Sequence, residues 1–370
     1  MKNYRNFKIV LFVVVFIVAI GFVVNTGAVY AKDGRKVIKL RAIAGHPAQA
    51  VPWVRMMKSY LIPELEKRVL EQTTDYELKI QENYGGSVAA LGEVLEAVES
   101  GIGDIGMVVW VFEMSKLHPH TATAWFPFSP RDPMVVLKAW RKTWEQYPFL
   151  EETFAKYNQK SIAFPPIGCY EIVSNFPITK LEDVKGHKLA HGGPMVPWIE
   201  AIGAVGVQSR LNEAYTSMQT GVYDGWLMEP NATVGLKMYE PSPYYTLVGL
   251  GAAITQCVTI NLDTWNKLPK EVQKIVTEVG RDYGEATAKA TANVYYKKIV
   301  FMATQGVTIR ELPKKERVRF AEAMNKALVS DVMAKESEKM GFSKASEMSK
   351  FYIQTISDLG YEWPWVPQIN

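Results

Sequence analysis

The order of strand-like and helical segments along the chain is the feature that most limits its fold. Short apolar segments over residues 37–44, 76–81, 104–111, 161–164 and 171–174 alternate with segments whose apolar residues recur at helical spacing. The third of these is apolar at most positions, which is typical of a strand buried on both faces of a parallel sheet. This alternation predicts helices layered on sheets, the α/β fold class.

Glycines and capping residues mark where individual elements begin and end. Gly85 and Gly86 break the second strand, and Ser87 is placed to cap a helix that runs through Val98. Amphipathic spacing from residue 313 to residue 359 predicts further helices near the C-terminus.

Two later segments predict how the α/β units are joined. Residues 252–262 form a long apolar run that we expect to cross between lobes as a strand. Residues 270–304 keep helical periodicity between Pro269 and Gly306, which predicts one long helix that braces both lobes.

The length of the chain exceeds the usual size of a single core, so we expect two domains. We predict a two-lobed, periplasmic-binding-protein-like fold. Lobe I should comprise residues 32–160 and 255–290, and lobe II should comprise residues 161–254 and 291–370 with the C-terminal helices.

The first 31 residues have the order of a signal peptide. Three basic residues precede an apolar run over residues 9–24, and the small side chains of Val29 and Ala31 suit cleavage after Ala31. The run is only slightly shorter than the roughly 20 residues needed to cross a bilayer, so an uncleaved membrane anchor stays an alternative. Charges interrupt every later apolar run, so we expect the remainder to fold in water in a periplasmic or other extracytoplasmic compartment.

Charge and cysteine content argue against two classes of function. The leader holds three basic and no acidic residues, so the net charge of +4 becomes +1 without it, and no basic footprint for nucleic acid is present. Cys169 and Cys257 are the only cysteines and lack metal-ligand spacing, so we expect no metal and no cofactor. A disulfide between them and a pair of buried free thiols are both open.

Three motifs occur in order along the chain. They are GGS, LGE and GxxDIG within residues 85–106, PITxLEDVKGxK over residues 177–188, and ExYxxMQTGVxDG over residues 213–225. Gly221, Gly225 and Asp224 suit tight turns and backbone hydrogen bonds, so we interpret them as scaffold. Taken together, the motifs resemble the receptor subunits of tripartite ATP-independent periplasmic (TRAP) transporters, the dicarboxylate-type family, over most of residues 38–310.

The resemblance implies two hinged lobes that close on a small organic acid, and membrane subunits of a TRAP transporter as partners. It favours a monomer over a swapped dimer. In the family, an arginine that pairs with the ligand carboxylate follows the segment matching residues 186–189, but this position is Ala190. A second position, often arginine in the family, is Tyr170. Because such a pair contributes about 1.5 to 3 kcal/mol, we expect a neutral, zwitterionic or largely apolar ligand unless another cation takes its place.

Candidate ligand-binding residues stand where family counterparts approach the cleft, or where a basic group could replace the arginine. For Arg210 a surface role is the alternative, and for each aromatic residue core packing is the alternative. The candidates are His46, Trp110, Tyr170, Ala190, His191, Arg210, Leu211, Trp226 and Glu229.

Two other functions are alternatives to solute binding. The sequence contains no HExxH set, no GxSxG elbow and no phosphate-binding lysine motif, so an enzyme is poorly supported. A sensory receptor that presents the same ligand to a chemoreceptor or sensor kinase would share fold and cleft. We predict an extracytoplasmic solute-binding receptor of a TRAP-type transporter that is not an enzyme.

Overall fold

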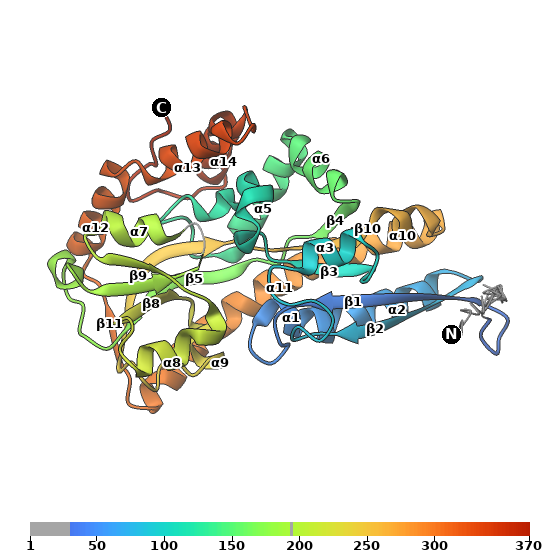
Figure 1. Cartoon of the computed structure of the whole chain (residues 1–370), viewed down its shortest axis with the longest axis horizontal. Helices are drawn as coiled ribbons and strands as arrows, with labels where there is room; N and C mark the ends of the chain where they lie inside the picture. The colour runs from blue at the N-terminus through green and yellow to red at the C-terminus, as the bar shows by residue number, and fades with distance from the viewer. Residues whose placement is uncertain (1–29, 193–194) are drawn as a thin grey trace, which may run out of the picture.

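The computed structural model describes residues 30–192 and 195–370, so nearly all of the predicted leader lies outside the described residues. Two mixed sheets organise the molecule (Figure 1). The first has the order β2-β1-β3-β10-β4 and comprises β1 (Lys36–Ala44), β2 (Tyr76–Asn83), β3 (Ile105–Val108), β4 (Gln159–Ala163) and β10 (Cys257–Asn261).

The second sheet has the order β11-β9-β5-β8-β6-β7. Its strands are β5 (Ile167–Ser174), β6 (Lys188–His191), β7 (Val205–Gln208), β8 (Gly225–Met228), β9 (Tyr244–Ala253) and β11 (Thr308–Glu311). Each sheet combines parallel and antiparallel pairs and is covered by helices, so the predicted α/β fold with two lobes is confirmed.

Two crossings of the chain connect the sheets. The apolar run predicted as one crossing strand is divided: β9 ends in the second sheet at Ala253, and β10 begins in the first sheet at Cys257. Gln256 Nε2 in this crossing donates to the carbonyl oxygen of Pro165, in the crossing from β4 to β5, at 2.8 Å. The two crossings are therefore tied to each other, as a hinge between lobes requires.

The long helix α11 (Lys270–Thr304) begins and ends where the sequence predicted. It packs against α2 (Ile62–Gln72) and β4 on the side of the first sheet, and against α9 (Pro230–Gly235) and β5 on the side of the second. Figure 1 shows it running from the first sheet toward the second, so it braces the two lobes as predicted.

Shorter helices cover the faces of the sheets. They are α1 (Pro52–Met56), the π-helix η1 (Met57–Leu61), α3 (Val94–Glu99), η2 (Trp110–Phe112), α4 (Met114–Leu117), η3 (His118–Ala124), α5 (Pro133–Gln146), α6 (Phe149–Lys156), η4 (Leu181–Val184), α7 (Val196–Ala201), η6 (Leu211–Glu213), α8 (Ala214–Gln219) and α10 (Leu262–Lys267). The helix predicted from Ser87 begins only at Val94, because Gly92 adopts a φ of +87° that ends any earlier helical turn.

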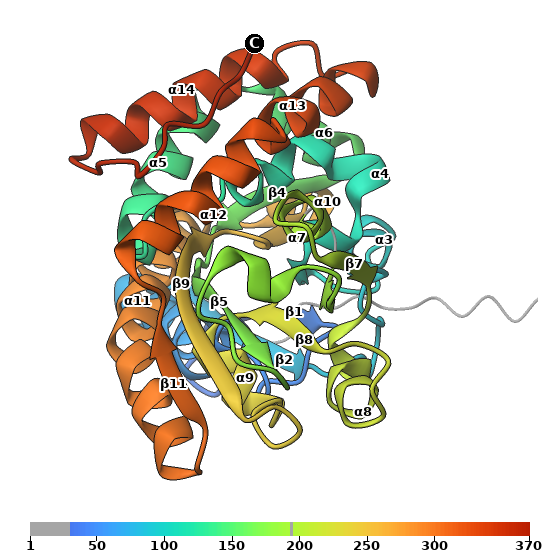
Figure 2. The same cartoon turned by 90° about the vertical axis from the view of Figure 1, so that its left-hand side faces the viewer.

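The C-terminal helices α12 (Lys314–Lys326), α13 (Val329–Lys339) and α14 (Ala345–Asp358) confirm the predicted helical region. Figure 2 shows them along one edge of the molecule, with α14 beside α5. The hydroxyl of Ser330 donates to the carbonyl oxygen of Trp125 at 2.7 Å, and α12 and α13 also contact α7. This layer contacts parts of the chain on both sides of the hinge.

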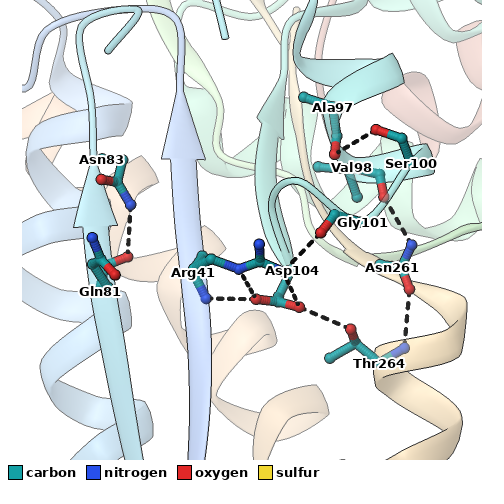
Figure 3. Close-up of polar contacts among 10 residues, drawn as sticks. All are labelled: Arg41, Gln81, Asn83, Ala97, Val98, Ser100, Gly101, Asp104, Asn261 and Thr264. Atoms are coloured by element: carbon teal, nitrogen blue, oxygen red, sulfur yellow. Dashed lines mark hydrogen bonds and ion pairs between the residues drawn. The ribbon is translucent and has the colours of Figure 1, made fainter. Parts of the chain in front are cut away.

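A polar network explains the GxxDIG motif as scaffold (Figure 3). The carboxylate of Asp104 accepts the backbone N–H of Arg41 at 2.8 Å and its Nε at 2.9 Å. It also accepts the hydroxyl of Thr264 at 3.0 Å, at the start of α10. Asn261 donates to the carbonyl oxygen of Val98 at 2.8 Å. One side chain thus joins β1, the segment before β3 and α10.

Asp224 has the scaffold role that the sequence predicted. Its carboxylate accepts the backbone N–H of Lys188 at 3.0 Å, which joins the segment before β8 to β6.

Burial of Cys169 and Cys257 raises the pKa of both thiols, and both are free, so no disulfide links β5 to β10. Within the described ranges, none of the helices has the length and apolar character needed to cross a bilayer.

Candidate functional site

A cavity lies between the two sheets, where the crossing at residues 254–256 passes. The first lobe, the crossing and the second lobe all contribute to its lining. The lining residues are His46, Trp53, Val109, Val111, Phe112, Ile167, Tyr170, His191, Gly192, Ser209, Leu211, Trp226, Met228, Glu229, Ala232 and Thr255. Several of them follow the carboxyl ends of β1, β3, β6 and β8, where ligands bind in open α/β sheets.

Most of the lining residues that carry a polar side-chain atom are aromatic. The ring centroid of His46 lies 5.5 Å from that of Trp53 in an edge-on arrangement. On the second lobe, the ring of His191 lies 5.3 Å from Tyr170 and 6.2 Å from Trp226. All five side chains are buried. The walls can therefore bury flat or apolar parts of a solute.

Several buried polar atoms in the lining have no hydrogen-bond partner among the described residues. They are the indole nitrogens of Trp53 and Trp226 and both ring nitrogens of His46. An unpaired buried donor costs about 1 to 3 kcal/mol, and proteins rarely leave such groups unpaired without a reason. A solute with hydrogen-bonding groups could pair them.

The two histidines of the lining are neutral at ordinary pH. Burial lowers the pKa of His46 and of His191 to about 4. Nδ1 of His191 lies against the carbonyl oxygen of Gly192, so this nitrogen carries the proton. Nε2 of His191 is then an acceptor, and neither ring carries a positive charge in the unliganded cavity at neutral pH.

Glu229 is the one acidic side chain among the described residues of the lining. It is only 1% exposed and caps α9, where it accepts the backbone N–H groups of Asn231 at 2.7 Å and Ala232 at 2.8 Å. Burial outweighs these bonds and raises the pKa of Glu229 to about 7. No lysine or arginine occurs among the described residues that line the cavity.

Six of the nine candidate residues line the cavity: His46, Tyr170, His191, Leu211, Trp226 and Glu229. Arg210 lies outside it and is exposed at the start of η6. Ala190 is fully buried in a core cluster with its strand neighbour Trp226 and does not reach the cavity.

Trp110 also lies outside the cavity. It packs in the core, which was the alternative that the sequence left open for this residue. Its ring is fully buried near Trp140 and Trp144, at centroid distances of 6.0 and 6.5 Å. Its indole N–H donates to the carbonyl oxygen of Ile254 at 3.2 Å, in the crossing between the sheets. Trp110 thus supports the hinge.

Sequence reasoning missed Trp53, Phe112, Ser209 and Thr255 among the polar or aromatic residues of the lining. Trp53 follows His46 closely, and its position on the first turn of α1, beyond the end of β1, was a signal that could have found it. Thr255 lies in the crossing, where the sequence predicted one continuous strand.

The raised pKa of Glu229 predicts a pH-dependent difference in stability between the wild type and Glu229→Gln. Folded Glu229 keeps its proton up to about pH 7, whereas in the unfolded chain it loses the proton near its ordinary pKa of 4.5. Its stabilising contribution is therefore present below pH 4.5 and is lost as pH rises to about 7. Relative to Glu229→Gln, the wild type should lose about 3 kcal/mol of unfolding free energy over this window.

Chemical denaturation at several pH values measures this difference. Other buried carboxyls with raised pKa, such as Glu171, remain in both proteins and cancel. Trp198→Phe, which removes no titrating group, should shift the whole profile without changing its slope. A constant difference between wild type and Glu229→Gln would contradict the prediction.

A cavity between two α/β lobes, with crossing strands as a hinge and unpaired polar groups in its wall, defines a two-lobed solute-binding protein. Residues 61–336 match the family model described as bacterial extracellular solute-binding protein, family 7, and the chain belongs to this family. The predictions of a TRAP-type solute receptor and of a binding protein rather than an enzyme are thereby confirmed.

Solved structures share the fold. A TRAP periplasmic solute-binding protein from Desulfovibrio salexigens superposes with a TM-score of 0.74 at 18% identity, covering 88% of this chain and 97% of that one. DctP6 of Bordetella pertussis, described as binding pyroglutamic acid, gives 0.73 at 18% identity, covering 87% and 100%. A second Desulfovibrio salexigens protein, with bound orotic acid, gives 0.72 at 19% identity, covering 87% and 99%.

Relatives are also found by sequence. A solute-binding protein of Sulfitobacter sp. strain NAS-14.1 is 23% identical over 258 residues, which are 68% of this chain and 77% of the relative. The C4-dicarboxylate-binding periplasmic protein DctP of Rhodobacter capsulatus is 30% identical over 180 residues, 47% of this chain and 52% of the relative. The names of both relatives, as binding proteins for solutes, agree with the family model.

Proposed function

We propose that this receptor captures a small organic solute other than a simple carboxylate between its lobes and delivers it to the membrane subunits of a TRAP transporter. The observation that carries the proposal is the absence of any lysine or arginine from the described lining of the cavity. Two similar structures hold pyroglutamic acid and orotic acid, and the R. capsulatus relative is named for dicarboxylates. A carboxylate buried here without a cation would bind poorly.

In this proposal, lobe I comprises residues 32–160 and 255–290, and lobe II comprises residues 161–254 and 291–370. The cavity has a volume of only about 40 Å³. A solute therefore needs the lobes to part, and then stabilises the closed form by touching both of them. His46 and Trp53 would hold it from lobe I, and Tyr170, His191 and Trp226 from lobe II.

Calorimetric titration of the purified protein tests the proposal. Succinate, malate, pyroglutamate and orotate should bind more weakly than about 1 mM, whereas a solute without a free carboxylate should bind in the micromolar range. Arg210→Ala should leave every affinity unchanged, because Arg210 is exposed and does not line the cavity. Micromolar binding of a simple dicarboxylate, unaffected by Arg210→Ala, would overturn the proposal.

A further inference from the structure

The acidic group of the cavity, once ionised, has the opposite charge from the one that an organic acid requires. Glu229 is the single acidic group among the described residues of the lining, and its two oxygens each accept one backbone N–H from the first turn of α9. A carboxylate oxygen has two lone pairs, so each keeps capacity for another donor. Its burial leaves this capacity available only to a group inside the protein or to a solute.

Aromatic rings, which can attract cations, line the same cavity as Glu229. Trp53, Phe112, Tyr170 and Trp226 line the same cavity. The face of each ring carries negative electrostatic potential, which attracts an ammonium group most strongly where water is excluded. Because His46 and His191 are neutral, no group of the lining competes for this potential.

We propose that the captured solute carries a positively charged nitrogen, which binds against the Glu229 carboxylate and the surrounding aromatic rings. This inference rests on the proposed function, since it requires that solutes enter the cavity between the lobes. A cation would pair the buried carboxylate and so remove the cost of burying its charge. The unpaired indole N–H groups of Trp53 and Trp226 can donate to the uncharged or delocalised polar part of the same solute.

The groups around Glu229 predict how binding depends on pH. Tyr170 on β5 and Tyr245 on β9 are neutral, because burial raises the pKa of both, helped by Glu229 at Tyr170 and chiefly by Glu171 at Tyr245. Lys298 on α11 lowers the pKa of Glu229, but it is the weakest of the influences on that group. With His46 and His191 also neutral, Glu229 is the group of the cavity that titrates near pH 7. Cation binding should therefore release a proton below pH 7 and tighten as pH rises to about 8.

The test compares each organic cation with an uncharged molecule of the same shape. Choline is measured beside 3,3-dimethyl-1-butanol, and a panel of primary and quaternary ammonium compounds is measured beside their carbon isosteres, by calorimetry at pH 8. At least one cation should bind about tenfold or more tightly than its isostere. Glu229→Gln should remove this advantage, and Glu213→Gln, which changes an exposed acid outside the cavity, should retain it.

The possible outcomes separate this inference from the function on which it rests. At pH 5.5 the advantage of the cation should fall at least tenfold in the wild type, and in Glu229→Gln it should be absent at both pH values. Equal binding of cation and isostere, or no binding of any cation in the panel, would overturn the inference and leave capture of an uncharged solute standing. If carboxylates bound more tightly than the cations and their isosteres, both this inference and the proposed function would be overturned. Mass spectrometry of solute that copurifies with the protein gives an independent check, and an anion there would likewise overturn both.

Discussion

Trp226→Ala should lower the free energy of unfolding by about 3 to 5 kcal/mol and weaken solute binding about a hundredfold. The ring is 1% exposed, forms part of the cavity wall, and lies 5.5 Å from Tyr223 and 6.2 Å from His191 between centroids. Alanine would leave a large hole in the core of the second lobe and would remove a wall against which the solute packs. Denaturant titration and calorimetry measure the two effects.

Two milder substitutions separate the loss of binding from the loss of stability. Trp226→Phe keeps an aromatic ring but removes the indole N–H that has no partner among the described residues. The loss of binding free energy should therefore exceed the loss of unfolding free energy. Trp198→Phe removes a similarly buried and unpaired indole N–H that does not line the cavity, and it should leave affinity unchanged. Wild-type affinity in Trp226→Ala would show that solutes bind elsewhere.

Gly280→Ala should destabilise the protein by about 3 kcal/mol, although alanine in place of glycine usually stabilises a helix by up to about 1 kcal/mol. A Cβ at this position of α11 would lie 2.1 Å from the carbonyl oxygen of Ile162 in β4. Backbone cannot move aside as a flexible side chain can, so the helix and the sheet would have to separate. Thermal and chemical unfolding measure the change.

Gly284→Ala, one turn further along α11, provides a graded control. Its added Cβ would lie 3.1 Å from the guanidinium of Arg141 and 3.3 Å from the carbonyl oxygen of Phe164, and small shifts can relieve both contacts. The loss of stability should therefore be clearly smaller than for Gly280→Ala. A stabilising effect of Gly280→Ala would show that α11 does not pack closely on β4.

Local patterns predicted most elements because the signals for them lie within one segment. Pro269 and Gly306 bound α11, since proline favours the first turn of a helix and glycine ends one. The failures have local causes that periodicity does not report. Gly92 delays the start of α3, and the apolar run at 252–262 leaves one sheet and enters the other without any break in its hydrophobicity.

The candidate site was predicted less completely, because residues that are adjacent in the sequence point in different directions in the fold. Val109 and Val111 line the cavity, whereas Trp110 between them turns into the core beside the crossing. His191 reaches the cavity, whereas Ala190 is covered in a cluster with Trp226. A family motif gives the segment that approaches a cleft, but the direction of each side chain depends on the backbone around it.

By itself, the sequence determined the two-lobed α/β architecture, the bracing helix and the loss of the cation at residues 170 and 190, since periodicity, capping and residue identity are local properties. Only the tertiary structure decided that Arg210 is exposed and that Glu229 shares one cavity with the tryptophans of both lobes. Burial and charge pairing depend on which distant segments the fold brings together, and no single segment of the sequence determines that arrangement.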